Sequence, residues 1–215
     1  MKITVDPITV KAESETAIRS AGGKICDWLP CLDRAELRPA DEIIGRALVM
    51  NALLNIYFKA PIPVVAEWIL KHGLTGHLSN TERDLLRCKN DALSEQQLID
   101  LFWYIEALWA LMWVGSLIDD LPFQSPVEDR MASMCPNLEK NEGPQKFTER
   151  MRLRKPNKIF QMLDLYFRVH WWARDGQING YTTKPADLDI VMERRKALEW
   201  VLNPNCNWDD VPLNT

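Results

Sequence analysis

The feature that most constrains the fold of this chain is a long apolar segment, rich in Trp, from Leu98 to Ile118. Its length is close to that of a membrane span, but it contains Asp100 and Glu106. A carboxylate near the centre of a bilayer costs roughly 2.5–3.5 kcal/mol. Because apolar side chains lie both around Glu106 and on the opposite side of the segment, we predict a helix buried in a protein core and no contact with a membrane.

Helix signals recur along much of the rest of the chain, whereas strands alternating with helices are absent. Pro residues, capping boxes and Gly residues mark the expected helix ends. We therefore predict an all-α protein, an irregular multi-helix bundle in one globular domain. The expected helices cover about 39–58, 63–72, 80–89, 95–115, 156–175 and 185–202.

The N-terminal region gives a weaker pattern. Residues 1–12 alternate weakly around Pro7, which allows either a short strand pair or a loose, extended N-terminal arm. We interpret residues 1–38 as this arm and a connecting segment, and residues 39–215 as the helical domain, a single globular unit. Recurring Pro residues between 119 and 144 predict a long surface excursion and not a domain linker, since similar helices follow it.

A buried carboxylate has to find a cation or hydrogen-bond donors, or take up a proton. Glu106 is such a group, and two arginines lie on apolar helix faces that should pack inward, Arg46 on the first predicted helix and Arg194 on the last. We predict a buried polar cluster in which Glu106 pairs with Arg194 or Arg46. The pair has two interpretations, an ion pair that fixes helix register or part of a ligand or catalytic site.

Other candidate site residues are less distinct. Arg168 and His170 lie on a helix in which Asp164–Arg168 and His170–Arg174 are four residues apart. These pairs are interpreted as ion pairs on an exposed helix face. In the alternative, functional interpretation, His170 is a general acid or base near a carboxylate. Asp209, next to Asp210, could help to bind a cation, but two adjacent carboxylates without further ligands do not make a site.

Charge and cysteine content limit the classes of function. The net charge of −4 argues against a surface built for nucleic acid, so the basic run from Arg150 to Lys158 is interpreted as solvated. Five cysteines in a chain of 215 residues indicate reduced thiols in a reducing, cytoplasmic compartment. Phosphate-binding loops and clustered Cys/His ligands are both absent, so we expect no cofactor and no metal ion.

Two stretches carry a resemblance to a known family. The segment Trp103–Trp113 and the ending, Glu193–Trp200 followed by Trp208–Val211, resemble the signatures of a bacterial domain-of-unknown-function family, number 4272. The resemblance implies that Arg46, Glu106, Arg194 and Trp208 belong to one shared design. It also shows two departures, Tyr104 where a basic residue is expected and Asn214 where Asp is expected.

These observations leave two hypotheses of function. The first is a cytoplasmic, non-enzymatic binding or interaction protein with a possible protein partner, whose oligomeric state the sequence does not give. The second is a hydrolase that uses Glu106 together with His170 or an arginine, which requires an open cleft that reaches Glu106.

Overall fold

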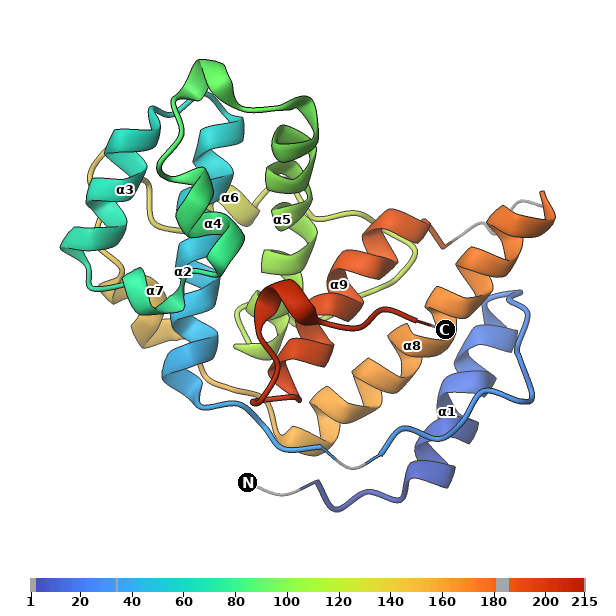
Figure 1. The fold of residues 1–215 in the computed structure, drawn as a ribbon. Coiled ribbons are helices and arrows are strands. Elements are labelled where there is room, and N and C mark those ends of the chain that lie inside the picture. Colours follow the sequence, from blue (N-terminus) through green and yellow to red (C-terminus); the bar gives the residue numbers. More distant parts are fainter. Residues whose placement is uncertain (1–2, 34, 181–185, 215) are drawn as a thin grey trace.

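The structure is a computed structural model that describes residues 3–33, 35–180 and 186–214, and these residues form helices and loops with no strand (Figure 1). The predicted all-α fold is therefore confirmed. The α-helices are α1 Pro7–Ser20, α2 Ala40–Tyr57, α3 Ile62–Lys71, α4 Asn80–Leu85, α5 Glu95–Val114, α6 Met131–Met134, α7 Gln145–Arg150, α8 Pro156–Asn179 and α9 Leu188–Val201. Three short 3-10 helices are η1 Thr75–His77, η2 Asn90–Ala92 and η3 Trp208–Asp210.

The helices begin where the sequence places start signals. Capping boxes open α4, through Ser79 and Glu82, and α5, through Ser94 and Gln97. Pro39 precedes α2, and Pro156 is the first residue of α8. The start of the last helix was expected at 185, which lies outside the described residues; α9 begins at Leu188 after its N-cap Asp187.

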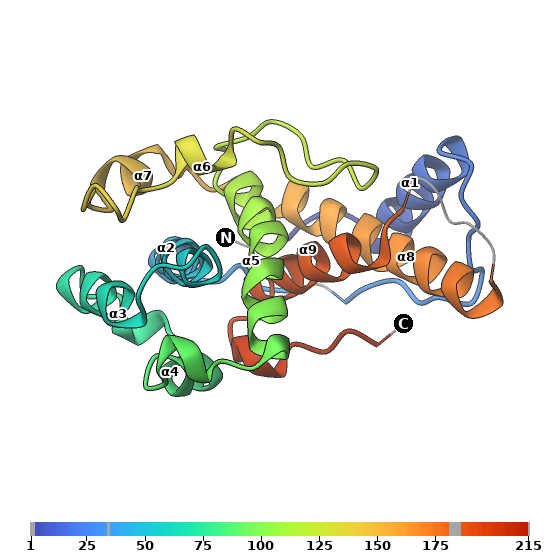
Figure 2. The same cartoon turned by 90° about the horizontal axis from the view of Figure 1, so that it is seen from above.

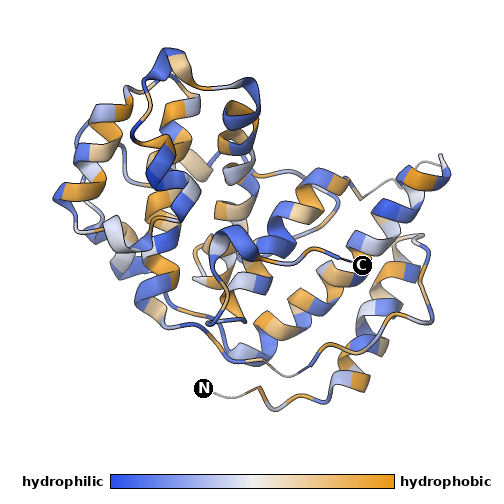
Figure 3. Ribbon diagram, in the orientation of Figure 1, coloured by the Kyte–Doolittle hydropathy of each residue, from blue (hydrophilic) through white to orange (hydrophobic). Residues whose placement is uncertain are grey.

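Helix α5 lies at the centre of the fold. It packs against α2 on one side and α9 on the other, while α8 packs against α9 and α1. Viewed from above, α5 and α9 separate α2, α3 and α4 from α8 and α1 (Figure 2). Apolar residues are distributed over all of the long helices (Figure 3), so the core continues from one group of helices to the other.

By length and composition α5 could cross a membrane, and 56% of its most apolar window is buried inside the fold. Residues 106–114 are all buried. A core helix passes the same test of length and composition, and the packing of α5 between α2 and α9 supports that interpretation.

The N-terminal region differs from the expected strand pair or arm. Helix α1 begins at Pro7, because Asp6 accepts hydrogen bonds from the backbone N–H groups of Ile8 and Thr9 and Pro7 suits the first helical turn. Of the residues that the structure describes, 3–6 precede this helix. Val10 and Ile18 on α1 belong to the same buried cluster as α2 and α5. The division of the chain at residue 38 stays a prediction.

The Pro-rich segment 119–144 is a long connection that includes only the short helix α6. Its apolar residues do not all face solvent: Leu121, Phe123 and Met131 are buried. The hydroxyl of Tyr166 on α8 donates to the carbonyl of Leu121 at 3.2 Å. The excursion is therefore attached to the core through several of its own side chains and main-chain groups.

Candidate functional site

Glu106 on α5 and Arg194 on α9 form a buried ion pair. Arg194 donates from Nε to Glu106 Oε2 at 2.8 Å, and its Nη2 lies 2.7 Å from the same oxygen. The other carboxylate oxygen, Oε1, accepts a hydrogen bond from the backbone N–H of Val127 at 3.0 Å. Glu106 is 2% exposed and Arg194 is 0% exposed. Both oxygens of Glu106 are thus occupied by donors from the protein itself.

Arg194 also binds the main chain of the segment that crosses this pair. Its guanidinium donates to the carbonyl oxygens of Pro122, at 2.7 Å, and Ser125, at 2.9 Å, and to the hydroxyl of Tyr166 at 3.2 Å. Burial raises the pKa of Tyr166 to about 12, so the phenol stays protonated. All three guanidinium nitrogens have acceptors, as a buried arginine requires. The site is closed and complete.

Arg46 does not belong to the Glu106 cluster, which corrects that part of the predicted polar cluster. It pairs with Glu82, the capping-box residue of α4, through two hydrogen bonds at 2.7 and 2.5 Å. A third bond, at 3.1 Å, joins Arg46 to the carbonyl of His77, and the ring of His77 packs on Gly45, one position earlier on α2. The α4 carboxylate is closer to this face of α2 than Glu106 is.

Tyr104 on α5 completes the Arg46–Glu82 pair. Its hydroxyl donates to Glu82 Oε1 at 2.7 Å, while the backbone N–H of Ser79 donates to Oε2 at 2.8 Å. Burial, and then the adjacent Glu82 carboxylate, raise the pKa of Tyr104 well above its ordinary value of 10.0. The phenol therefore remains a donor at physiological pH, and Glu82 is fully bonded.

Trp208 on η3 lies next to this second pair and is 4% exposed. The guanidinium carbon of Arg46 lies 4.5 Å from the centroid of its ring, and the ammonium nitrogen of Lys196 lies 4.9 Å from it. The indole N–H of Trp208 and the Nε–H of Arg46 are both buried without an acceptor. Asp209 attaches η3 to α4, accepting from the N–H of Thr81 at 3.1 Å and from its hydroxyl at 2.8 Å.

Of the two pairs expected on α8, Asp164–Arg168 is formed but is buried and not exposed, whereas the buried His170 bonds Arg195 on α9 and not the exposed Arg174. Arg168 binds both oxygens of Asp164, at 2.9 and 2.8 Å. His170 contacts Nη1 of Arg195 through Nδ1 at 2.6 Å. Burial and then the charges of Arg195 and Arg174 lower the pKa of His170 to about 4. A neutral ring that accepts from Arg195 at Nδ1 is the arrangement consistent with both facts.

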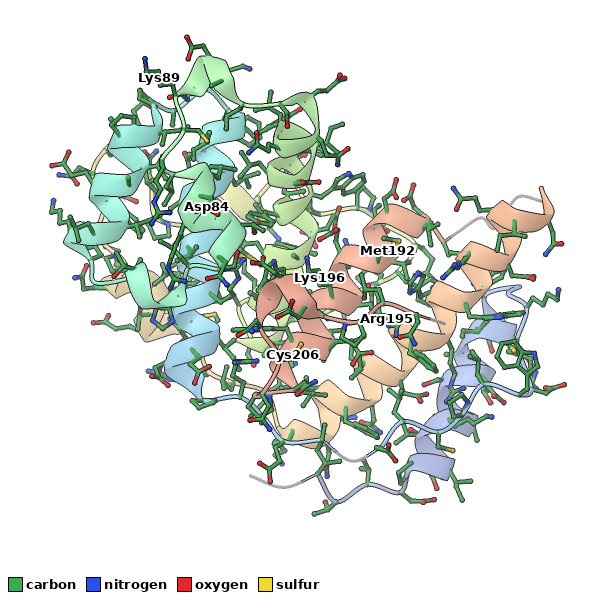
Figure 4. All side chains as sticks on the ribbon, in the orientation of Figure 1. Asp84, Lys89, Met192, Arg195, Lys196 and Cys206 are labelled. Atoms are coloured by element: carbon green, nitrogen blue, oxygen red, sulfur yellow. The ribbon has the colours of Figure 1, made fainter. Side chains whose placement is uncertain are left out.

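A cavity of about 560 Å³ lies between α4, α5, α9 and η3, and we call it the α5 cavity. Figure 4 labels two residues that line it, Asp84 on α4 and Lys196 on α9. Its complete lining is Thr81, Glu82, Asp84, Leu85, Cys88, Gln97, Asp100, Leu101, Trp103, Tyr104, Glu193, Lys196, Trp208 and Asp209. The cavity thus combines aromatic and aliphatic walls with several carboxylates and one ammonium group.

Glu193 and Lys196 are the two charged residues that α9 contributes to the α5 cavity. They are three residues apart, a spacing at which opposite charges commonly pair. Neither makes a hydrogen bond or an ion pair to any described residue. Burial raises the pKa of Glu193 to about 7, with Lys196 lowering it and Asp100, Asp189 and Glu106 adding to the rise. This carboxylate is therefore half-buried without a partner.

A second cavity of about 460 Å³, the α2 cavity, lies on the other side of Trp208 and Asp209. Its arginines already have partners. Arg38 donates to the carbonyls of Trp200, Asn203 and Cys206 and to Glu42, and Arg83 donates to Asn80 and Thr75. Arg46, which also lines the α2 cavity, is paired with Glu82 although its Nε–H has no acceptor. We place the candidate site in the α5 cavity because its two charged side chains from α9 have no bonded partner among the residues that the structure describes.

The sequence singled out Trp208 and Asp209 at the α5 cavity but missed Glu82, Tyr104, Glu193 and Lys196. Glu82 was assigned only a capping role, although its burial shows a second role as partner of Arg46. Glu193 and Lys196 could have been noticed as an i,i+3 pair beside Arg194. That Glu193 and Lys196 do not form an ion pair depends on tertiary packing, which the sequence pattern does not predict.

Comparison with known proteins identifies a family. The family described as Domain of unknown function (DUF4272) matches residues 10–211. The chain belongs to this family. Among curated proteins nothing matches the chain, and nothing matches it among solved structures. The match includes most of α1 as well as the later helices, so the DUF4272 region extends well beyond the stretches that carried the resemblance.

The four residues that the DUF4272 resemblance grouped together divide between two places. Glu106 and Arg194 form the closed pair, while Arg46 and Trp208 lie in contact beside Glu82. Tyr104, which stands where a basic residue was expected, donates to the same Glu82 carboxylate that a cation there would bind. In this DUF4272 member a neutral donor therefore completes the Arg46–Glu82 pair.

Proposed function

We propose that the protein is a non-enzymatic binding protein that holds its ligand in the α5 cavity. The observation that carries this proposal is the coexistence of unpartnered charges, Glu193 and Lys196, with aromatic walls in a cavity of about 560 Å³. Sites for small molecules are commonly cavities of roughly 300–1,000 Å³ with apolar walls and a few polar groups that fix orientation. The Glu193 and Lys196 side chains are half-buried at the cavity and have no bonded partner in the described part of the chain, so their charges are open to a bound molecule.

The geometry gives no support to a hydrolase that uses Glu106. A general acid or base has to come within hydrogen-bond reach of the substrate. Both Glu106 oxygens are bonded, the side chain is 2% exposed, and residues 122–127 close over it. His170 is likewise occupied by Arg195 and is 2% exposed. The binding hypothesis is therefore the one that we carry forward.

We also propose a bacterial, cytoplasmic setting. All five cysteines are free thiols, and Cys26 and Cys135 are buried. Free thiols are typical of a reducing compartment. The bacterial origin rests on the resemblance of the Trp-rich helix and the Trp208 ending to the family signatures.

The thiol of Cys88 allows a direct test, because Cys88 lines the α5 cavity. The native protein would be incubated with a deproteinised extract of small molecules from bacterial cells and then treated with an alkylating reagent. Peptide mass spectrometry would measure how far each cysteine is alkylated. Protection of Cys88 is expected, with no protection of Cys31, an equally half-buried thiol outside the cavity. Equal alkylation of both thiols with and without extract would contradict the proposal.

A further inference from the structure

The two unpartnered charges of α9 define what kind of ligand the α5 cavity can satisfy. Glu193 offers an acceptor and Lys196 a donor, and both half-buried side chains line the cavity without a bonded partner in residues 3–33, 35–180 and 186–214. An ordinary cation would leave Lys196 unmatched and an ordinary anion would leave Glu193 unmatched. We propose that the α5 cavity binds a zwitterionic small molecule of the free α-amino-acid class, an inference that rests on the proposed function.

The charged ends of the ligand can be assigned by chemistry. The ammonium group would bind Glu193, on a wall that also carries Asp100. The carboxylate would bind Lys196, whose ammonium nitrogen lies 4.9 Å from the centroid of the Trp208 ring. The indole N–H of Trp208, buried without an acceptor, is a second donor on a residue of the cavity wall.

The remaining lining indicates the side chain of the ligand. Leu85, Leu101, Trp103 and the ring of Tyr104 provide an apolar wall between α4 and α5. Tyr104 and Glu82 are already bonded to each other and offer no free charge to a ligand side chain. A large apolar side chain, aromatic or aliphatic, matches this wall and the cavity volume.

The other charged residues of the lining do not neutralise Glu193 and Lys196. Glu82 is paired with Arg46, Asp84 with Arg87, and Asp209 accepts from Thr81. Asp100 accepts from Gln96. Each of these carboxylates has a partner among the described residues, which singles out the pair on α9 as the incomplete part of the site.

Three probes of the same phenyl skeleton separate the charge requirements: phenylalanine, 2-phenylethylamine and 3-phenylpropionate. Affinity would be measured by isothermal titration calorimetry on the full chain, and the position of binding by protection of Cys88 from alkylation. Phenylalanine is expected to bind about tenfold more tightly than either singly charged probe, since it adds one charge-assisted contact. A singly charged probe that binds as tightly as phenylalanine would overturn the inference.

Charge-removing variants identify the two ends. Glu193→Gln should weaken phenylalanine and 2-phenylethylamine about tenfold and leave 3-phenylpropionate unchanged. Lys196→Gln should weaken phenylalanine and 3-phenylpropionate and leave 2-phenylethylamine unchanged. Glu149→Gln, an exposed position on α7, is the matched control, and melting curves verify that each variant folds. Equal losses for all three probes in either variant would contradict the assignment of the ends.

The results also separate this inference from the proposed function. If cell extract protects Cys88 while none of the three probes binds, the α5 cavity remains a binding site but its ligand is not of the amino-acid class. If neither extract nor probes protect Cys88, both proposals are wrong. Binding of phenylalanine that leaves Cys88 fully reactive would place the amino acid elsewhere and overturn the inference.

Discussion

Two carboxylates between α5 and α9 differ in how far the protein satisfies them. Glu106 is bonded at both oxygens by Arg194 and by the N–H of Val127, in a site with no space for another molecule. Glu193, on the helix that carries Arg194, lines a cavity and has no bonded partner among the described residues. The comparison teaches that burial of a charge does not by itself mark a binding site. An unfilled hydrogen-bonding requirement next to open space is the better indication.

The largest effect is expected from breaking the filled site. Arg194→Met should lower the free energy of unfolding by about 3–5 kcal/mol, because it leaves Glu106 buried without its cation. Urea denaturation followed by circular dichroism measures the change. Arg174→Met, at an exposed position on α8, is the control and should change stability by less than about 0.5 kcal/mol. A small loss for Arg194→Met would show that the closed pair is dispensable.

Removal of Arg46 should have a smaller effect than removal of Arg194. Arg46→Met is expected to lower the free energy of unfolding by about 2–3 kcal/mol, because Glu82 keeps the donors from Tyr104 and Ser79. The same denaturation experiment compares it with Tyr104→Phe, for which about 1 kcal/mol is expected. The reverse order of the two arginine variants would contradict the ranking of the two sites.

His170 should make stability depend on pH. Folding lowers the pKa of His170 from its ordinary value of 6.5 to about 4. Between about pH 4 and pH 6.5 the imidazole is therefore protonated in the unfolded chain and neutral in the folded protein. Stability therefore falls as pH falls through this window, by about 2 kcal/mol between pH 7.5 and pH 5. Urea midpoints at both pH values measure the loss. In His170→Gln this part of the slope should disappear, and an unchanged slope would disprove the assignment.

Neutralising the open site should give a small effect, and one of opposite sign. The pKa of Glu193 rises from 4.5 to about 7 on folding, so ionisation above pH 7 destabilises the folded state. Glu193→Gln should therefore raise the free energy of unfolding by about 1–2 kcal/mol at pH 8, reduced by the partial exposure of the side chain. The gain should shrink to about a quarter of this at pH 5, where Glu193 is protonated in the folded protein but still largely ionised in the unfolded chain.

Thermal unfolding at pH 5 and pH 8 tests this dependence of the gain on pH, with Glu149→Gln again as the control. The charged groups that affect the pKa of Glu193 lie on α5 and α9, and α4 and η3, which face it across the cavity, each contribute one further carboxylate. They are Asp100, Glu106, Asp189, Lys196, Asp84 and Asp209. A loss of stability for Glu193→Gln at pH 8 would mean that Glu193 already has a partner, and the contrast between the two carboxylates would fail.

Most of the fold could be predicted from local signals. Helix starts at Ser79, Ser94 and Pro156 are encoded by a few adjacent residues, and the structure begins its helices there. Helix α1 was missed because weak alternation around Pro7 was given more weight than the Asp6-Pro7 start signal. Periodicity correctly indicated that Arg46, Glu106 and Arg194 face inward.

The partners of those inward residues could not be predicted as reliably as their burial. Arg46 was free to pair with Glu106 or with any other carboxylate until the helices were placed in space. Its partner, Glu82, is on a six-residue helix whose position depends on the loops around it. The α5 cavity was equally inaccessible to sequence reasoning, since α4, α5, α9 and η3 meet only through tertiary packing.

The contacts of Arg194 and Glu106 with the segment 122–127 have a consequence for how this stretch can evolve. The contacts use the carbonyls of Pro122 and Ser125 and the amide of Val127, that is, main-chain atoms alone. An exposed side chain such as that of Gln124 can therefore be substituted without loss of these contacts. Deletion of a single residue, in contrast, would move the two carbonyls and the amide away from Arg194 and Glu106. Length, together with the buried side chain of Phe123, is what this stretch has to preserve.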